Sequence, residues 1–217
     1  MIYLDNAATT FPKPQKVYEA LDYANRNLAF NAGRGNYKKS LEAQQIIENC
    51  KSSISSIIGK NPEMVAFSSS ATESLNLIIN GLDLQYGDTV YVSPFEHNAI
   101  IRPLYNLQSK INFNIEIIPF NKTTWKIDVD TFKNQLAINK PKAVFMSHVS
   151  NVTGYILPYE EAFEMSKKYG SINILDCAQS FGLINPNIKN VDFIVFAGHK
   201  SLYASFVVAG FINVGDV

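Results

Sequence analysis

After residue 60, short apolar runs alternate with longer amphipathic stretches, and this alternation constrains the fold more than any other feature. The runs are rich in β-branched and aromatic residues, which favour buried strands, whereas the stretches between them space apolar residues as helices do. We expect strands at 64–68, 89–92, 114–119, 142–147, 172–175, 192–196 and 206–212, and helices at 72–81, 98–109, 130–138 and 159–169. The pattern predicts an α/β protein with a mostly parallel sheet flanked by helices on both faces.

The first 60 residues differ, because they contain helical patterns but no strand pattern. An extended arm over 1–13 precedes a helix that begins at Pro14 and places its apolar residues on one face. A loop with two glycines leads into a long amphipathic helix that ends at Gly59 and whose apolar face includes Cys50. We expect Cys50 in the core, and one domain over 1–217, with the arm and first helices at about 1–60 and the sheet at about 61–217.

Composition narrows the class of protein. Of 217 residues, 47% are hydrophobic and 18% charged, with 19 basic and 19 acidic side chains. This balance argues against nucleic acid or a membrane surface as a partner. The N-terminus lacks a basic segment followed by an apolar one, no apolar run is long enough to span a bilayer, and two cysteines make neither a disulfide framework nor a metal cluster. We expect a cytoplasmic protein without a metal site.

A lysine follows one of the predicted strands. The run at 192–196 stops before Gly198 and presents His199 and Lys200 just beyond it. Ligands of open α/β sheets bind outside the carboxyl ends of the strands. Lys200 is therefore either a surface charge or a reactive amine.

A helix start after the first strand offers a second element of a site. Ser70 and Glu73 have the spacing of a capping box, so the helix begins near Ala71 and its free amides and dipole suit a phosphate. Thr72 adds a hydroxyl. An ordinary helix cap has the same pattern, and the Gly-Lys-Ser/Thr of a Walker motif is missing.

Further polar residues follow other strands. His97 can stack on a cofactor ring or move a proton, or simply begin a helix. Asn151 can donate to an anionic oxygen, or belong to an ordinary loop. Asp176 ends an apolar run, where a protonated ring nitrogen would stabilise its charge, although an N-cap role explains it as well. Gln179 can reach the same ligand, whereas Cys177 points to the other face and is a packing residue.

These strand-end residues occur in an order that supplies a phosphate cradle, a stacking group, a partner for a ring nitrogen and an amine, which are the needs of pyridoxal phosphate. The sequence resembles the class V aminotransferase family of fold-type I pyridoxal phosphate enzymes, most of all its cysteine desulfurase and selenocysteine lyase branch. The matching segments are Tyr3–Thr10, Phe67–Leu77, Glu96–His97, His148–Gly154, Asp176–Gln179 and Gly198–Lys200.

The resemblance implies three catalytic residues. Lys200 would bind the cofactor aldehyde as a Schiff base and move protons, Asp176 would pair with the pyridine nitrogen, and His97 would stack on the ring.

The resemblance also implies the remaining contacts. The phosphate would be held by the backbone of Ala71, by Thr72 and by His199, and Gln179 and Asn151 would lie near the ring hydroxyl and the substrate. Asn31 and Arg34, in the loop before the long helix, are weaker candidates for substrate or dimer contacts.

Three departures from the family pattern stand out. Ala197 replaces a Ser or Thr phosphate ligand, and Ala204-Ser205 replaces a Gly-Pro turn. Family members are longer, and the small C-terminal domain, which carries the nucleophilic cysteine in desulfurases, is expected to be absent here. No cysteine follows Cys177.

The implied function is a cysteine desulfurase-like enzyme that removes sulfur from L-cysteine and leaves alanine, present here as its cofactor-binding domain. A small amino-acid substrate and a homodimer follow from the same resemblance. The alternatives are a selenocysteine lyase or aminotransferase of the same family, or a truncated, non-catalytic fragment that binds cofactor or a partner. A nucleotide-binding protein is disfavoured, because Gly-x-Gly-x-x-Gly and Walker loops are missing.

Overall fold

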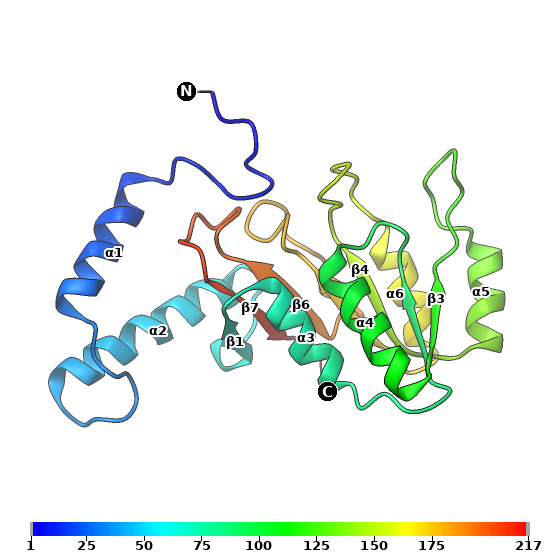
Figure 1. Ribbon diagram of the computed structural model, residues 1–217, viewed down its shortest axis with the longest axis horizontal. Coiled ribbons are helices and arrows are strands. Elements are labelled where there is room, and N and C mark those ends of the chain that lie inside the picture. The colour runs from blue at the N-terminus through cyan, green and yellow to red at the C-terminus, as the bar shows by residue number, and fades with distance from the viewer. Residues whose placement is uncertain (1, 216–217) are drawn as a thin grey trace.

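A computed structural model describes residues 2–215, which contain a seven-stranded sheet with the order β1-β7-β6-β5-β4-β2-β3 (Figure 1). The strands are β1 (Val65–Ser68), β2 (Thr89–Val92), β3 (Asn114–Ile117), β4 (Pro141–Ser147), β5 (Ile172–Asp176), β6 (Phe193–Ala197) and β7 (Ala209–Asn213). Strands β2 to β6 pair in parallel, whereas β7 is antiparallel to both β6 and β1. The predicted mostly parallel sheet is confirmed.

Helices cover both faces of the sheet. They are α1 (Gln15–Asn27), α2 (Lys38–Ser56), the 3-10 turn η1 (Pro62–Met64), α3 (Ala71–Gly81), α4 (Asn98–Ile111), α5 (Val129–Ile138) and α6 (Tyr159–Lys167). One apolar core joins α3 and α4 to strand residues such as Val90, and the other joins α2, α5 and α6 to residues such as Tyr91. Successive strand residues point to opposite faces of the sheet, so adjacent residues pack into different cores.

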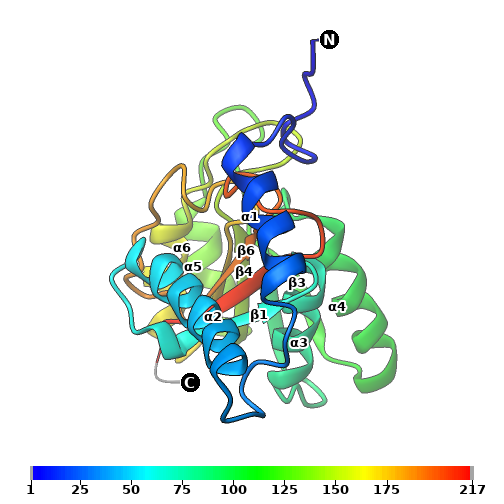
Figure 2. The same cartoon turned by 90° about the vertical axis from the view of Figure 1, so that its left-hand side faces the viewer.

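The first two helices lie beside the β1 edge of the sheet, and α1 stands outermost (Figure 2). None of the residues of α1 is buried, and α2 buries side chains only near its two ends, at Ser40, Ala43, Ile54 and Ser55. Cys50, in between, is exposed, so its predicted place in the core is wrong. Helical spacing groups the apolar residues of α2, but it does not reveal that the middle of the helix extends beyond the sheet.

Several element boundaries differ from the prediction by a few residues, and two of the differences have clear local reasons. The last strand begins at Ala209 rather than at 206, because residues 206–208 belong to the loop that returns from Lys200. Val207 in this loop has a φ of 64°, a left-handed conformation that a strand does not use. The last helix ends at Lys167, shortly before Gly170, whose φ of 79° terminates the helical path.

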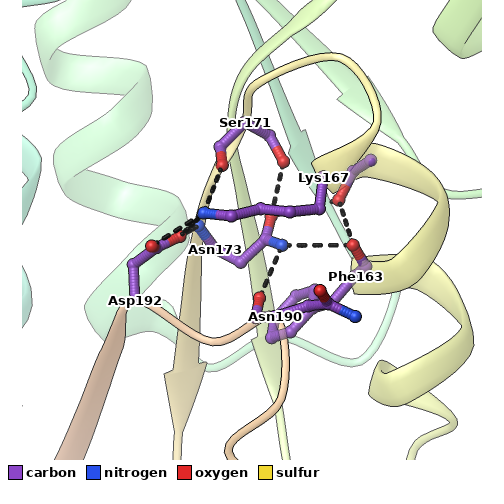
Figure 3. Close-up of polar contacts among 7 residues, drawn as sticks. Phe163, Lys167, Ser171, Asn173, Asn190 and Asp192 are labelled. Carbon is purple, nitrogen blue, oxygen red and sulfur yellow. Dashed lines mark hydrogen bonds and ion pairs between the residues drawn. The ribbon is translucent and has the colours of Figure 1, made fainter. Parts of the chain in front are cut away.

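A buried polar network joins the amino-terminal ends of β5 and β6 (Figure 3). The Lys167 ammonium lies 2.6 Å from the carboxylate of Asp192, whose side chain is 4% exposed. Asp192 also accepts a 2.8 Å hydrogen bond from the backbone N–H of Asn173, and the Asn173 side chain bonds the Phe163 and Asn190 carbonyls. The network fixes the start of the two strands that carry Asp176 and, just past β6, Lys200.

None of the helices in residues 2–215 has the length and hydropathy needed to cross a membrane.

Candidate active site

A cavity of about 460 Å³ opens at the carboxyl ends of the parallel strands. Its wall includes every residue expected to contact the cofactor: Ala71, Thr72, His97, Asn151, Asp176, Gln179, His199 and Lys200. These residues come from segments that follow β1, β2, β4, β5 and β6. The parallel topology therefore gathers at one edge residues that are far apart in the sequence.

The start of α3 presents free backbone donors to this cavity. Ser70 is the N-cap and accepts a 3.1 Å hydrogen bond from the Glu73 N–H, as predicted. The Glu73 carboxylate turns to Ser69 instead of Ser70, and bonds both its N–H and its hydroxyl. The N–H groups of Ala71 and Thr72 find no acceptor within residues 2–215. The segment is thus both an ordinary cap and a positively polarised helix end at the cavity.

Asp176, the last residue of β5, is a buried carboxyl in the cavity wall with 6% exposure. One oxygen accepts a 2.9 Å hydrogen bond from the Ala178 N–H, and within residues 2–215 the group has no ion-pair partner. Burial raises the pKa of Asp176, while the Ala178 bond and the nearby Lys200 and His97 lower it. An enclosed carboxyl of this kind gains stability from a cationic donor placed in the cavity.

Lys200 lies just past β6, and its amine shares the cavity with Asp176. Burial lowers the pKa of Lys200, and Asp176 raises it in part. A lowered pKa increases the fraction of free amine, the form that attacks a carbonyl carbon. Burial, with Lys200 and Lys13 nearby, also lowers the pKa of the neighbouring His199.

His97 begins a helix, as one of its two interpretations predicted, and it also lines the cavity. It is the N-cap of α4, where its Nδ1 accepts a 3.1 Å hydrogen bond from the Ala99 N–H, and the same residue lines the cavity. Gln179 donates a 3.0 Å hydrogen bond to the Ala7 carbonyl, which fixes it against the N-terminal arm. Asn151 lies in the turn after β4 and is exposed. Helix capping and a place in the cavity wall are thus compatible in one histidine.

Asn31 and Arg34 do not join the cavity. They lie in the loop between α1 and α2, where the Asn31 carbonyl accepts a 2.8 Å hydrogen bond from the Ser40 hydroxyl. Their predicted substrate or dimer contacts stay a prediction.

The N-terminal arm forms part of the cavity wall. The sequence patterns at the strand ends did not predict this contribution. Asp5, Ala7 and Ala8 line the cavity. The Thr9 hydroxyl and the Thr10 N–H each donate a 3.1 Å hydrogen bond to the His199 carbonyl. No local pattern predicts a contact across this length of chain.

The polar residues predicted at the strand ends did not include Glu96. Its carboxyl accepts hydrogen bonds from the Ser93 hydroxyl, the Ser147 N–H and the Ser147 hydroxyl. Burial of this group raises its pKa to about 7. The sequence contains a signal for Glu96, because its carboxylate follows shortly after a buried strand. Asp176 was predicted from a similar position, at the end of a buried strand.

The residues around Lys200 that differ from the family's sequence pattern have defined positions in the structure. Ala197 lines the cavity and supplies no hydroxyl there. The loop is closed by hydrogen bonds of 2.9 Å from Ala204 N–H to the Gly198 carbonyl and 2.8 Å from Gly198 N–H to the Val208 carbonyl. Tyr203 adopts a φ of 57°, so a non-glycine residue makes this turn.

Neither cysteine offers a thiol to the cavity. Cys177 is fully buried in the core beneath α6, and burial raises the pKa of its thiol far above its usual range. Cys50 lies on α2 and does not line the cavity. Cys177 is therefore a packing residue, as predicted from its position next to Asp176.

Comparison with known proteins identifies the same family. Residues 2–206 match the family described as aminotransferase class-V. A probable cysteine desulfurase of Pyrococcus abyssi is 33% identical over 92% of this chain and 50% of its own length. A probable cysteine desulfurase of Vibrio cholerae is 32% identical over 94% of this chain and 51% of its own length. The chain spans about half the length of the curated relatives it matches.

Solved structures agree with the fold. The apo structure of a cysteine desulfurase from Thermococcus onnurineus has a TM-score of 0.89 at 30% identity, over 98% of this chain and 53% of that one. A protein described as NifS-like also has a TM-score of 0.89, over 100% of this chain and 60% of that one, and at 22% identity it supports the fold alone. The cavity residues, the sheet order and these matches lead to one conclusion: the chain belongs to the class-V aminotransferase family.

Proposed function

We propose that this chain is the pyridoxal phosphate-binding part of a cysteine desulfurase. One observation carries the proposal: a single cavity combines the uncompensated buried carboxyl of Asp176, the amine of Lys200 with its lowered pKa, and the free helix start at Ala71. These groups match the pyridine nitrogen, the aldehyde and the phosphate of that cofactor. The curated relatives named as cysteine desulfurases support the reaction type.

Each residue has a defined task in this proposal. The N–H of Ala71, the Thr72 hydroxyl and His199 hold the phosphate, and the α3 dipole favours its charge. Asp176 accepts the ring N–H⁺, which gives its buried carboxylate the missing cationic partner. His97 packs against the ring, and Gln179 and Asn151 orient the ring hydroxyl and the substrate.

When bound, pyridoxal phosphate acts as an electron sink for negative charge at the substrate Cα. Lys200 would hold the cofactor covalently through its amine. Because its pKa is lowered, the free Lys200 amine can accept the Cα proton and return it later.

The sulfur acceptor is not among residues 2–215 in this proposal. Desulfuration needs a thiolate that reaches the substrate sulfur, and Cys177 is enclosed in the core with a strongly raised pKa. A thiol from elsewhere in the enzyme, or an added thiol, has to take this role. The homodimer and the cytoplasmic location rest on the resemblance and the sequence, and remain predictions.

Product analysis tests the reaction type. Purified chain with pyridoxal phosphate is incubated with L-cysteine and dithiothreitol, and sulfide, alanine and pyruvate are measured. Dithiothreitol supplies the two reducing equivalents, so each cysteine gives one alanine and one sulfide while the dithiol becomes a disulfide. We expect slow, equimolar sulfide and alanine with the wild-type chain and none with Lys200→Ala.

Other product patterns decide against the desulfurase. A ketoacid with conversion of the cofactor to its amine form identifies an aminotransferase, and activity restricted to selenocysteine identifies a lyase. Cofactor attachment without any product identifies a non-catalytic binding fragment.

A further inference from the structure

Glu96 connects two of the segments that build the cavity. It lies between β2 and α4, immediately before His97. Its Oε1 accepts a 2.8 Å hydrogen bond from the Ser147 N–H and a further one from the Ser93 hydroxyl. Its Oε2 accepts a 2.8 Å bond from the Ser147 hydroxyl. The carboxyl therefore ties the segment that carries His97 to the end of β4.

The same carboxyl lies next to the site of the cofactor. Ser147, which donates both bonds from β4, lines the cavity and pairs with Asp176 on β5 in the parallel register. Asp176 raises the pKa of Glu96 through like-charge repulsion. Beyond Asp176, the charged groups that act on this pair are Lys200 and His97, which face Asp176. Ser147 thus lies next to two enclosed carboxyls, those of Glu96 and Asp176, and within residues 2–215 Glu96 has no ion-pair partner.

The environment of Glu96 supports both protonation states. Its three donors suit an ionised carboxylate, which accepts hydrogen bonds only. Burial opposes ionisation more strongly and raises the pKa to about 7. A modest change in the local charge is enough to change the state of Glu96 near neutral pH.

We propose that Glu96 is a positioning residue of this cavity that holds the His97 segment on β4 and gives up its proton when positive charge enters beside Asp176. The inference rests on the proposed function, because the positive charge is the protonated ring nitrogen of pyridoxal phosphate. A ring cation beside Asp176 offsets the repulsion that Glu96 experiences from that carboxylate. The released proton goes to solvent, and no bond other than the O–H of Glu96 breaks.

The sign of the pH effect follows from this linkage. Cofactor binding favours ionised Glu96, so affinity for the cofactor rises as pH increases through the pKa of about 7 and then levels off. Lys200 also loses its proton as pH rises, but that contribution is the same in a Glu96 variant. The quantity that isolates Glu96 is therefore the ratio of the two dissociation constants.

The test measures the dissociation constant of pyridoxal phosphate without substrate, through quenching of the fluorescence of Trp125, the one tryptophan of the chain. Trp125 contacts Phe95, the residue before Glu96, at a ring distance of 5.4 Å. Wild type, Glu96→Gln and the exposed control Glu164→Gln are compared from about pH 6 to about pH 8. The ratio of the dissociation constant of Glu96→Gln to that of wild type should grow about two- to five-fold over this range, as a pKa change of about half to one unit requires. The control ratio should stay constant.

A second variant keeps the test decisive if Glu96→Gln fails to fold. Ser93→Ala removes one donor to the Glu96 carboxylate, and Ser93 does not line the cavity. The loss of this bond raises the pKa of Glu96 further, so the inflection of cofactor affinity should move to higher pH. A constant Glu96→Gln ratio, or an unmoved inflection in Ser93→Ala, overturns the role of Glu96. Absence of any cofactor attachment to Lys200 overturns the proposed function itself, a distinct result.

Discussion

The Thr10 hydroxyl donates a 2.5 Å hydrogen bond to the backbone carbonyl of Lys200, across 190 positions of the sequence. The Thr10 N–H donates a 3.1 Å hydrogen bond to the His199 carbonyl, so the arm binds the two peptide carbonyls on either side of the Lys200 Cα. The arm also lines the cavity through Asp5, Ala7 and Ala8. It therefore positions the amine that the cofactor would need.

Replacement of Thr10 by valine should weaken cofactor binding. The variant keeps the shape of the side chain but removes the hydroxyl that fixes the Lys200 carbonyl. One hydrogen bond contributes about 0.5–1.5 kcal/mol, so we expect the dissociation constant of pyridoxal phosphate to rise about two- to ten-fold. Thr123→Val, in an exposed loop after β3, is the matched control and should bind as wild type does. Equal affinity of the two variants would show that the arm does not support Lys200.

Replacement of Asp176 by asparagine should stabilise the free protein while weakening cofactor binding. Burial raises the pKa of Asp176, so the folded state loses stability as pH rises from the unfolded pKa of 3.8 through the folded one. Asparagine removes this cost and keeps an oxygen for the Ala178 N–H. We expect the melting temperature at about pH 7 to rise by about 2–4 °C for each kcal/mol gained in the free energy of unfolding. This increase in melting temperature should shrink as pH falls toward about 4.

Thermal melts with and without pyridoxal phosphate check both parts of this prediction. Cofactor should raise the melting temperature of wild type more than that of Asp176→Asn. A variant that melts below wild type at neutral pH and gains as much from cofactor would contradict the role assigned to Asp176.

Replacement of Lys167 by methionine should destabilise the fold without touching the cavity. The change leaves the buried Asp192 carboxylate without its cation, although its bond to the Asn173 N–H remains. Lys167 is 36% exposed, so we expect a loss of about 1–3 kcal/mol rather than the full cost of breaking a buried pair. Lys168→Met, next along the chain and exposed, should change stability by less than about 0.5 kcal/mol.

Urea unfolding of these two variants provides the measurement. Equal midpoints for Lys167→Met and Lys168→Met would mean that the network at the start of β5 and β6 contributes no stability.

The two cysteines should react at very different rates with iodoacetamide. Cys177 is fully buried, and burial raises the pKa of its thiol strongly, whereas Cys50 is exposed on α2. Only the thiolate reacts, and it must be accessible. Mass spectrometry of the native chain should find Cys50 modified first and Cys177 only after unfolding. Early modification of Cys177 would show that a reactive thiol lies beside Asp176. Cys177 would then be a candidate sulfur acceptor.

The residues that could be predicted from the sequence are those whose position follows from one local pattern. Asp176 and Lys200 lie at or just past the ends of apolar strands, and the Ser70–Glu73 spacing marks the start of α3. A parallel sheet then brings such ends together without further information. For this reason the residues that line the cavity can be predicted from the sequence.

The residues that were missed or misplaced depend on contacts between distant segments. Thr10 meets Lys200 only because the arm folds back over the sheet edge. Cys50 has the spacing of a core residue, but the middle of α2 extends beyond the sheet and leaves it exposed. Asn31 and Arg34 do not line the cavity of this chain, and their predicted substrate or dimer contacts stay a prediction. Periodicity gives the face of a helix but not what lies against it.

Covalent attachment of the cofactor tests the central claim most directly. The chain is mixed with pyridoxal phosphate, reduced with borohydride, digested and mapped by mass spectrometry, beside Lys200→Ala and the surface control Lys168→Ala. Stoichiometric labelling of Lys200 in wild type and in the control, and its loss in Lys200→Ala, is the predicted result. Labelling of a different lysine, or labelling of equal extent in Lys200→Ala, would contradict the account.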